Sequence, residues 1–316
     1  MSLSLKDIQS ARQRIASCVR RTPLNPSATL SGRLKTNVYV KLEMFQKTGS
    51  FKVRGAFSKA LTLTPEERAR GIVAVSGGNH AQAVAYVARA LGLRSVVLMP
   101  ETTPRNYVEA TRGYGAEIKF AATVGAAFSE VAEFEREGWV YIHPFDDHLV
   151  MAGQGTVGLE ILEDVPQVTD IVISIGGGGF AGGVATAVKS LKPAVRIWGV
   201  ETEGADCMSK SLAAGKVETL DAVTSIARTL GAPAPSDRTL ALAQQLLEGV
   251  TVVPDSEAVS ALLFLLERLK VLAEPAASCT LAAADRLRDK FAPERHVVLV
   301  LCGGNFAVED LAKLQA

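Results

Sequence analysis

Short apolar segments alternate with alanine-rich helical segments along most of this chain of 316 residues. Helical periodicity is clearest in residues 79–92 and 180–192. The apolar segments have the length and composition of buried strands, and they lie at residues 37–43, 72–76, 95–100, 116–120, 170–175, 195–201 and 296–301. This alternation predicts an α/β protein with mostly parallel, doubly wound sheets that carry helices on both faces.

The length of the chain is sufficient for two domains of ordinary size. No repeat of fixed period, low-complexity tract or Gly/Ser linker marks a boundary between them, so the division rests on the pattern of strands and helices. We expect a small domain at residues 70–145, inserted into a large domain that is formed by residues 1–69 and 146–316.

Charge and cysteine usage narrow the class of protein. The 34 Lys and Arg residues balance 33 Asp and Glu residues, which argues against a nucleic-acid partner. No apolar run has membrane-spanning length, and the first 15 residues lack the apolar core of a secretory signal. The cysteines Cys18, Cys207, Cys279 and Cys302 are scattered, as is typical of free thiols in a reducing compartment. We therefore expect a cytoplasmic protein with neither a membrane nor a nucleic acid as partner.

Lys52 is the most unusual residue of the chain, because it lies among apolar side chains in QKTGSFKVRGA (residues 46–56). Its neighbours Phe51 and Val53 predict that it is half-buried, in a turn bounded by glycines. Burial without a partner lowers the pKa of a lysine, because the charged form loses its hydration. A neutral amine of this kind is a nucleophile.

Four consecutive glycines follow the strand at residues 170–175 and open a helix, in SIGGGGFAGGVATA (residues 174–187). Glycines let the backbone approach an anion, and a helix N-terminus offers free N–H groups, so a phosphate is the natural ligand. Gly177, Gly179 and Gly182, with Glu201 further on, also satisfy the spacing of a dinucleotide site. Close packing of strand and helix is a third interpretation.

Two further glycine-containing turns follow predicted strands. SGGNHAQAVAY (residues 76–86) follows a strand; its Ser76 and Asn79 either cap the helix or help to hold a carboxylate. LCGGN (residues 301–305) places Cys302 at the end of the last strand, where ligands collect in open α/β sheets, although a packed thiol is the alternative. An amine, a phosphate cup, a carboxylate cup and a thiol together match the needs of pyridoxal phosphate.

The sequence strongly resembles the pyridoxal-phosphate-dependent serine/threonine dehydratase family, which includes serine racemase and has the tryptophan-synthase-β-like fold (fold type II). The resemblance covers nearly the whole chain, in the order expected of the family. Its motifs are QKTGSFKVRGA, SGGNHAQAVA, HPFDD (residues 143–147), AGQGTVGLEI (152–161), GGGGFAGG and EPAAS (274–278).

This resemblance implies the roles of individual residues, with the cofactor in the cleft between the two domains. Lys52 would hold pyridoxal phosphate as a Schiff base and would then take the proton from the substrate Cα. The other cofactor-binding residues would be Phe51 at the ring, Asn79 at its phenolic oxygen, Gly176, Gly177, Gly178 and Gly179 at the phosphate, and Cys302 at the pyridine nitrogen. The substrate carboxylate would lie in the loop that contains Ser76, Gly77, Gly78 and His80.

Two segments depart from the pattern of the family. The frequent family sequence IADG is here IART (residues 226–229), with Arg228 and Thr229 in the last two places. Relatives with a divalent cation have an aspartate where Cys207 stands, and Mg²⁺ and Ca²⁺ prefer oxygen ligands, so no metal is predicted near Glu201.

The resemblance implies an ammonia-lyase that converts L-β-hydroxy amino acids, of the threonine and serine type or bulkier ones such as phenylserine, to a 2-oxo acid and ammonia. It also suggests a homodimer or homotetramer. A serine or aspartate racemase is the main alternative, and an NAD-dependent oxidoreductase is a weaker one. Gly77 favours the lyase, because related racemases have a serine hydroxyl at that position.

Overall fold

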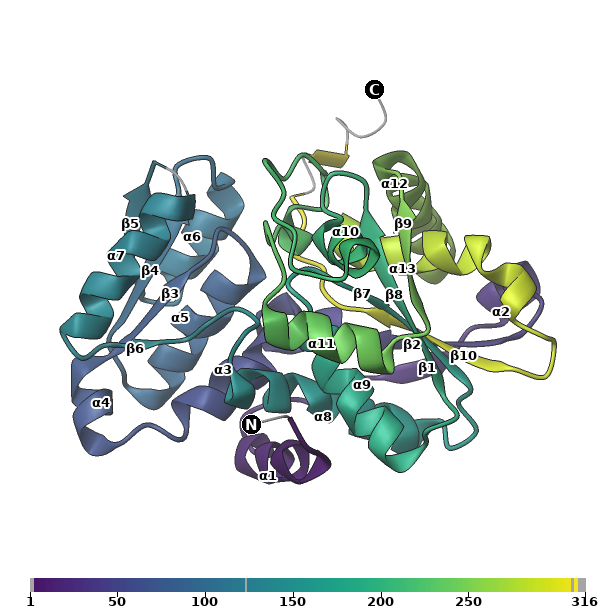
Figure 1. Ribbon diagram of the computed structural model, residues 1–316, viewed down its shortest axis with the longest axis horizontal. Helices are drawn as coiled ribbons and strands as arrows, with labels where there is room; N and C mark the ends of the chain where they lie inside the picture. The colour runs from purple at the N-terminus through teal and green to yellow at the C-terminus, as the bar shows by residue number, and fades with distance from the viewer. Residues whose placement is uncertain (1–2, 123, 308–309, 312–316) are drawn as a thin grey trace.

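The computed structural model describes residues 3–122, 124–307 and 310–311, and it contains two sheets wrapped by helices (Figure 1). The larger sheet has six strands in the order β1-β2-β10-β7-β8-β9, and the smaller has four in the order β5-β4-β3-β6. Neighbouring strands are parallel throughout except for β1 and β2, which are antiparallel. The predicted α/β fold with mostly parallel sheets is confirmed.

The larger lobe is built on the six-stranded sheet. Its strands are β1 (Leu24–Pro26), β2 (Asn37–Leu42), β7 (Asp170–Ser174), β8 (Arg196–Thr202), β9 (Gly249–Val253) and β10 (His296–Leu301). Its helices are α1 (Leu5–Ile15), α2 (Ala28–Leu34), α3 (Lys52–Ala60), α8 (His148–Asp164), α9 (Gly179–Leu191), α10 (Cys207–Ala214), α11 (Asp237–Leu246), α12 (Asp255–Phe264) and α13 (Pro275–Arg286). Helices α1, α8 and α9 lie on one side of the sheet, and α12 and α13 lie on the other (Figure 1).

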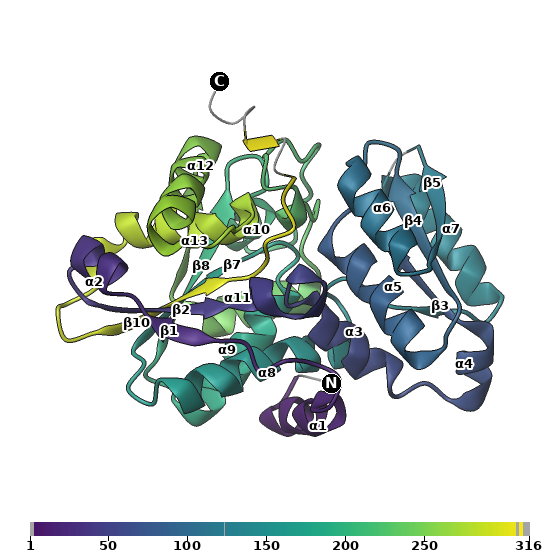
Figure 2. The ribbon, with the colours of Figure 1, turned by 180° about the vertical axis from the view of Figure 1, so that it is seen from behind.

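The smaller lobe is built on the four-stranded sheet, and it stands beside the larger one in both views (Figures 1 and 2). Its strands are β3 (Ile72–Val75), β4 (Ser95–Pro100), β5 (Glu117–Ala121) and β6 (Val140–Tyr141). Its helices are α4 (Pro65–Arg70), α5 (Asn79–Leu91), α6 (Arg105–Gly113) and α7 (Val124–Arg136). We propose that the domain boundaries lie near residues 70 and 145, as the sequence pattern suggests.

All seven predicted strands are present, with ends that agree to within about one residue. The sequence pattern missed β1, β6 and β9. β1 and β6 have only three and two residues, too few to show a period. β9 is an edge strand that is only partly buried over most of its length, so it lacks the continuous apolar run of the central strands.

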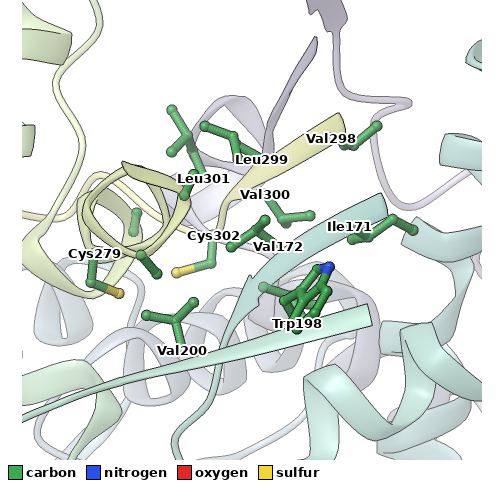
Figure 3. Close-up of a cluster of buried hydrophobic side chains, with 14 of the residues drawn as sticks. Ile171, Val172, Trp198, Val200, Cys279, Val298, Leu299, Val300, Leu301 and Cys302 are labelled. Carbon is green, nitrogen blue, oxygen red and sulfur yellow. The ribbon is translucent and has the colours of Figure 1, made fainter. Parts of the chain in front are cut away.

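The hydrophobic core of the larger lobe includes one of the predicted site residues, Cys302. Figure 3 shows buried side chains of β7, β8 and β10, among them Val172, Trp198 and Val300, with Cys302 just beyond the end of β10. Cys302 is therefore held by the packed core beneath it. No helix in the described part of the chain is long and apolar enough to cross a membrane.

Candidate active site

One cavity of about 750 Å³ brings together every residue that the sequence predicts for the site. The predicted residues on its wall are Phe51, Lys52, Ser76, Gly77, Gly78, Asn79, His80, Gly176, Gly177, Gly178, Gly179 and Cys302. Phe51 and Lys52 come after β2 and two short helical turns, and the other residues directly follow the carboxyl ends of β3, β7 and β10, where parallel sheets collect ligands. A second hollow, of about 800 Å³, lies beside Arg94 and Trp139 in the smaller lobe and is lined by none of these residues.

Lys52 is the first residue of helix α3, and its Nζ donates a hydrogen bond to the Pro144 carbonyl oxygen over 2.7 Å. The sequence predicted a turn at this position, which is wrong. The turn lies earlier, at Thr48 and Gly49, whose φ angles of 64° and 73° reverse the chain before the helix begins. Burial lowers the Lys52 pKa to about 8, although Cys302 and Glu274 act in the opposite direction.

A buried ion cluster fixes helix α3. Arg54, two residues after Lys52, forms ion pairs with Glu43 at 2.9 Å and Glu160 at 2.7 Å. Lys41 also pairs with Glu160, at 2.6 Å, so the group joins β2, α3 and α8. Buried charges are tolerated when they are paired and hydrogen-bonded in this way. Arg54 therefore anchors the helix, whereas Lys52 at its start faces the cavity.

An aromatic pair forms part of the cavity wall next to Lys52. The rings of Phe51 and Phe180 are stacked, with centroids 3.8 Å apart and planes 12° apart. The Phe51 backbone N–H donates to the Cys302 carbonyl oxygen over 3.1 Å. This bond holds the start of the lysine helix against the end of β10.

The glycine turn between β7 and α9 forms a cup of bare backbone. Gly178 has a φ of 89°, a left-handed conformation that favours glycine, and it precedes α9 without a side-chain cap. A Cβ atom added at Gly177 would lie 2.3 Å from the Phe145 ring, and one at Gly179 would lie 2.3 Å from the Phe145 carbonyl oxygen. The first N–H groups of a helix have no partner within it, so this cup suits a phosphate.

The loop before α5 is shaped by its own hydrogen bond. The Ser76 hydroxyl accepts from the Gly78 N–H over 3.0 Å, and α5 begins at Asn79 with no side-chain cap. Of the two interpretations of this loop, capping of α5 by Ser76 or Asn79 is not found in the structure. Each side chain is held elsewhere, and the N–H groups at the start of α5 stay available to an anionic group.

The opposite side of this loop contains a buried histidine and a threonine hydroxyl. His80 Nε2 donates to the Ile142 carbonyl oxygen over 2.7 Å, and Nδ1 has no partner among the described residues. Burial lowers the His80 pKa to about 3, so the ring is neutral and Nδ1 is a free acceptor. A Cβ added at Gly77 would lie 2.6 Å from the Thr103 hydroxyl oxygen, so the space beside Gly77 is already filled.

A hydrogen-bond network that the sequence did not predict holds Asn79. Its Nδ2 donates to both carboxylate oxygens of Glu274, at 2.8 and 3.1 Å, and its Oδ1 accepts from Asn305 Nδ2 over 2.8 Å. Thr229 also donates to Glu274, and Asn305 donates to the Thr48 carbonyl oxygen. Burial raises the Glu274 pKa to about 7. Glu274 and Asn305 belong to the motifs EPAAS and LCGGN, but nothing in the sequence indicated their contact with Asn79.

Cys302 is a buried, neutral thiol. It donates to the Ala276 carbonyl oxygen over 3.5 Å and accepts from the Ser174 hydroxyl over 3.4 Å. Burial raises its pKa, with Glu274 as a further cause, so the thiolate is disfavoured. A ligand atom that contacts Cys302 in the cavity therefore contacts an uncharged side chain.

Glu201 does not line the cavity. Its carboxylate accepts from the backbone N–H groups of Met208 at 2.9 Å and Ser209 at 2.8 Å, at the start of α10. Burial raises its pKa to about 8. Among the described residues, no group of three His, Cys, Asp or Glu side chains is placed to hold a metal ion.

The cavity fits pyridoxal phosphate on chemical grounds. It offers a lysine amine of lowered pKa, a glycine cup in which a Cβ would collide with Phe145, an amide and a neutral thiol. A dinucleotide would use the same cup but would leave the lysine without a role. Lys52 would hold the cofactor, the glycines its phosphate, and Asn79 and Cys302 its ring.

Comparison with known proteins shows which family this chain belongs to. The model of the pyridoxal-phosphate-dependent enzymes matches residues 15–303, so the chain is a member of that family. Pyridoxal phosphate is accordingly its cofactor, and the NAD-dependent interpretation is set aside.

The most informative relatives are ammonia-lyases. The chain is 38% identical to the L-threonine ammonia-lyase of Thermotoga maritima, over 99% of this chain and 78% of the relative. It is 41% identical to that of Geobacter sulfurreducens, over 96% and 76%. It is an enzyme of the carbon–oxygen lyase type represented by these proteins.

Solved structures agree with this assignment and also include a racemase. The T.th. threonine deaminase superposes with a TM-score of 0.91 at 38% identity, covering 96% of this chain and 99% of that one. Maize serine racemase superposes with a TM-score of 0.95 at 35% identity, covering 100% and 97%.

Proposed function

We propose that this protein is an ammonia-lyase that converts L-β-hydroxy amino acids of the threonine and serine type to a 2-oxo acid and ammonia. The observation that carries the proposal is the position of Lys52, which lines one cavity together with the glycine cup and whose amine has a pKa of about 8. The threonine ammonia-lyases and the threonine deaminase among its relatives support this substrate class.

The residues of the cavity divide the chemical work. The bound cofactor supplies an electron sink that lowers the energy of negative charge at the substrate Cα. The loop at Ser76 and Gly78 binds and orients the substrate carboxylate through its N–H and hydroxyl groups. Lys52 takes the Cα proton, and loss of the β-hydroxyl follows. Orientation and charge placement are the contribution of the protein.

An amino-acid racemase is the second candidate, and one observation supports it. Racemisation needs a proton donor on the face of Cα opposite Lys52. Gly77 has no side chain, but the Thr103 hydroxyl oxygen lies 2.6 Å from where a Cβ at Gly77 would be, and Thr103 lines the same cavity. In the structure this hydroxyl donates to the Pro100 carbonyl oxygen over 2.6 Å, which withdraws its proton from the cavity. We therefore place elimination ahead of racemisation.

A panel of substrates tests the proposal. Purified enzyme with pyridoxal phosphate is given L-threonine, L-serine and L-threo-phenylserine in turn, and ammonia and the 2-oxo acid are both quantified. Recovered amino acid is analysed on a chiral column.

We expect equal amounts of ammonia and 2-oxo acid from at least one substrate, with little D-amino acid. Binding of the cofactor without release of ammonia from any of the three would contradict the lyase. D-serine formed faster than the 2-oxo acid would establish the racemase instead.

Location and assembly are part of the same proposal. We propose a cytoplasmic enzyme that forms a homodimer or homotetramer, on the grounds of its free cysteines and its family. Sedimentation equilibrium tests the assembly.

A further inference from the structure

Arg228 is a charged residue of the cavity wall that the proposed chemistry does not use. It begins a short helical turn, η3 (Arg228–Leu230), and lines the same cavity as Lys52. This places a positive side chain in the wall of the substrate cavity.

The backbone around Arg228 is firmly held. The Ile226 N–H donates to Asp255 over 2.9 Å, the Ala227 N–H donates to the Ser225 hydroxyl over 3.0 Å, and the Thr229 hydroxyl donates to Glu274 over 2.9 Å. These bonds fix the residues on both sides of Arg228, so its Cα is positioned before any ligand arrives. Preorganisation of this kind lowers the entropic cost of binding.

The side chain of Arg228, in contrast, has no acidic partner. It is exposed, and among the described residues no carboxylate forms an ion pair or hydrogen bond with its guanidinium. Of the two acids that share the cavity wall, Glu274 is occupied by Asn79 and Thr229, and Asp221 is exposed. A fork of N–H donors therefore remains free at the cavity.

The position of Arg228 relates it to the substrate carboxylate loop. The methyl group of its neighbour Thr229 lies 3.3 Å from where a Cβ at Gly78 would be, so this segment packs on the loop that takes the α-carboxylate. When the loop binds the α-carboxylate of a substrate, the side chain of that substrate extends from the neighbouring Cα atom. Guanidinium binds carboxylate through two parallel hydrogen bonds.

We propose that Arg228 selects β-hydroxy amino acids whose side chain ends in a second carboxylate, with L-threo-3-hydroxyaspartate as the simplest member. This inference rests on the proposed lyase function and deepens it. The Cα proton and the β-hydroxyl leave as water, and water returns when the C–N bond is hydrolysed. The amino acid becomes oxaloacetate and ammonia, with no net water consumed and no oxidant or reductant required.

Kinetics on matched variants test the proposal. Wild-type enzyme, Arg228→Gln, Arg228→Lys and the surface control Arg268→Gln are each given L-threo-3-hydroxyaspartate, L-threonine and L-threo-phenylserine. Arg268 is exposed and lies outside the cavity wall. The affinity of each variant for pyridoxal phosphate is measured in parallel.

We expect wild-type kcat/KM to be highest for 3-hydroxyaspartate. Arg228→Gln should lower that value about ten- to a hundredfold more than it lowers the value for threonine, as loss of a charged hydrogen bond predicts. Arg228→Lys should be intermediate because it keeps the charge but loses the fork. The Arg268 variant should match wild type.

A binding measurement separates this inference from the proposed function. Calorimetry compares succinate with butyrate, which has the same four carbons but only one carboxylate. Tighter binding of succinate that is lost in Arg228→Gln supports the carboxylate site, even if no amino acid were turned over.

Three results would overturn the inference. The first is an equal loss of kcat/KM for all substrates in Arg228→Gln, and the second is a preference of the wild type for phenylserine. The third is a loss of cofactor affinity in Arg228→Gln, which would assign Arg228 to the cofactor phosphate.

Discussion

The Nζ of Lys52 and the carbonyl oxygen of Pro144 lie 2.7 Å apart and are joined by a hydrogen bond. Lys52 begins α3 in the larger lobe, whereas Pro144 follows β6 at the point where the chain returns from the smaller lobe. The Pro144 turn is held by His143 Nδ1, which accepts from the N–H groups of Phe145 and Asp146 over 3.2 and 2.7 Å. The reactive amine is thus positioned by a turn that both lobes share.

The lowered pKa of Lys52 predicts its reactivity with pH. In the cofactor-free enzyme, labelling of Lys52 by trinitrobenzenesulfonate should rise through a midpoint near pH 8, because burial lowers its pKa from 10.5 to about 8. Below that pH the amine is protonated and unreactive, so labelling should fall as the pH drops. Peptide mass spectrometry follows Lys52 beside peptides that carry exposed lysines. A curve for Lys52 that coincides with theirs would contradict its desolvation.

The sequence predicted what is local and strongly patterned, and missed what depends on distant contacts. The central strands and the partial burial of Lys52 were predicted because the apolar residues that indicate them lie within about ten residues of one another in the sequence. The contact between Asn79 and Glu274 joins positions 195 residues apart, and no local pattern encodes it. The choice between helix capping and an anion site at Ser76 and Asn79 stayed open for the same reason, since Asn79 is held by that distant carboxylate and does not cap its own helix.

The neutral thiol of Cys302 predicts a contrast between two substitutions. Cys302→Ser keeps an uncharged partner and should retain most turnover. Cys302→Asp should slow net elimination about tenfold, or about 1.4 kcal/mol in activation free energy, because a carboxylate favours a protonated pyridine nitrogen. Turnover is measured for both, with Cys18→Ser as a control outside the cavity wall and thermal melting to check folding. Equal turnover in all three would mean that Cys302 is only a packed thiol.

Gly77 predicts the balance between elimination and racemisation. A serine at this position would supply a hydroxyl on the second face, but its Cβ would lie 2.6 Å from the Thr103 hydroxyl oxygen. The double variant Gly77→Ser/Thr103→Ala removes that collision. It should raise the ratio of D-serine to 2-oxo acid at least about tenfold, since a positioned acid or base contributes roughly a hundredfold or more.

Chiral chromatography of recovered serine measures this ratio, and Thr103→Ala alone is the control. Loss of a wild-type racemase activity in that control would show that the Thr103 hydroxyl already serves the second face, and elimination would no longer be the main reaction.

The environment of Glu201 predicts the effect of a chelator. Its two carboxylate oxygens are occupied by the N–H groups of Met208 and Ser209, and the adjacent Cys207 offers sulfur, whereas Mg²⁺ and Ca²⁺ prefer oxygen ligands. EDTA should therefore leave both turnover and the melting temperature unchanged. Loss of either, with recovery on adding Mg²⁺ or Ca²⁺, would show that Glu201 and nearby carbonyl groups bind a cation after all.

The covalent role of Lys52 is tested most directly by borohydride reduction followed by peptide mass spectrometry. Reduction should fix the cofactor on the peptide that contains Lys52, because a lysine amine and the cofactor aldehyde form a reducible bond. Lys52→Ala should lose both this adduct and all turnover but keep its melting temperature, whereas Lys6→Ala, on the exposed face of α1, should retain all three properties. A cofactor adduct on another lysine, or normal turnover in Lys52→Ala, would contradict the account.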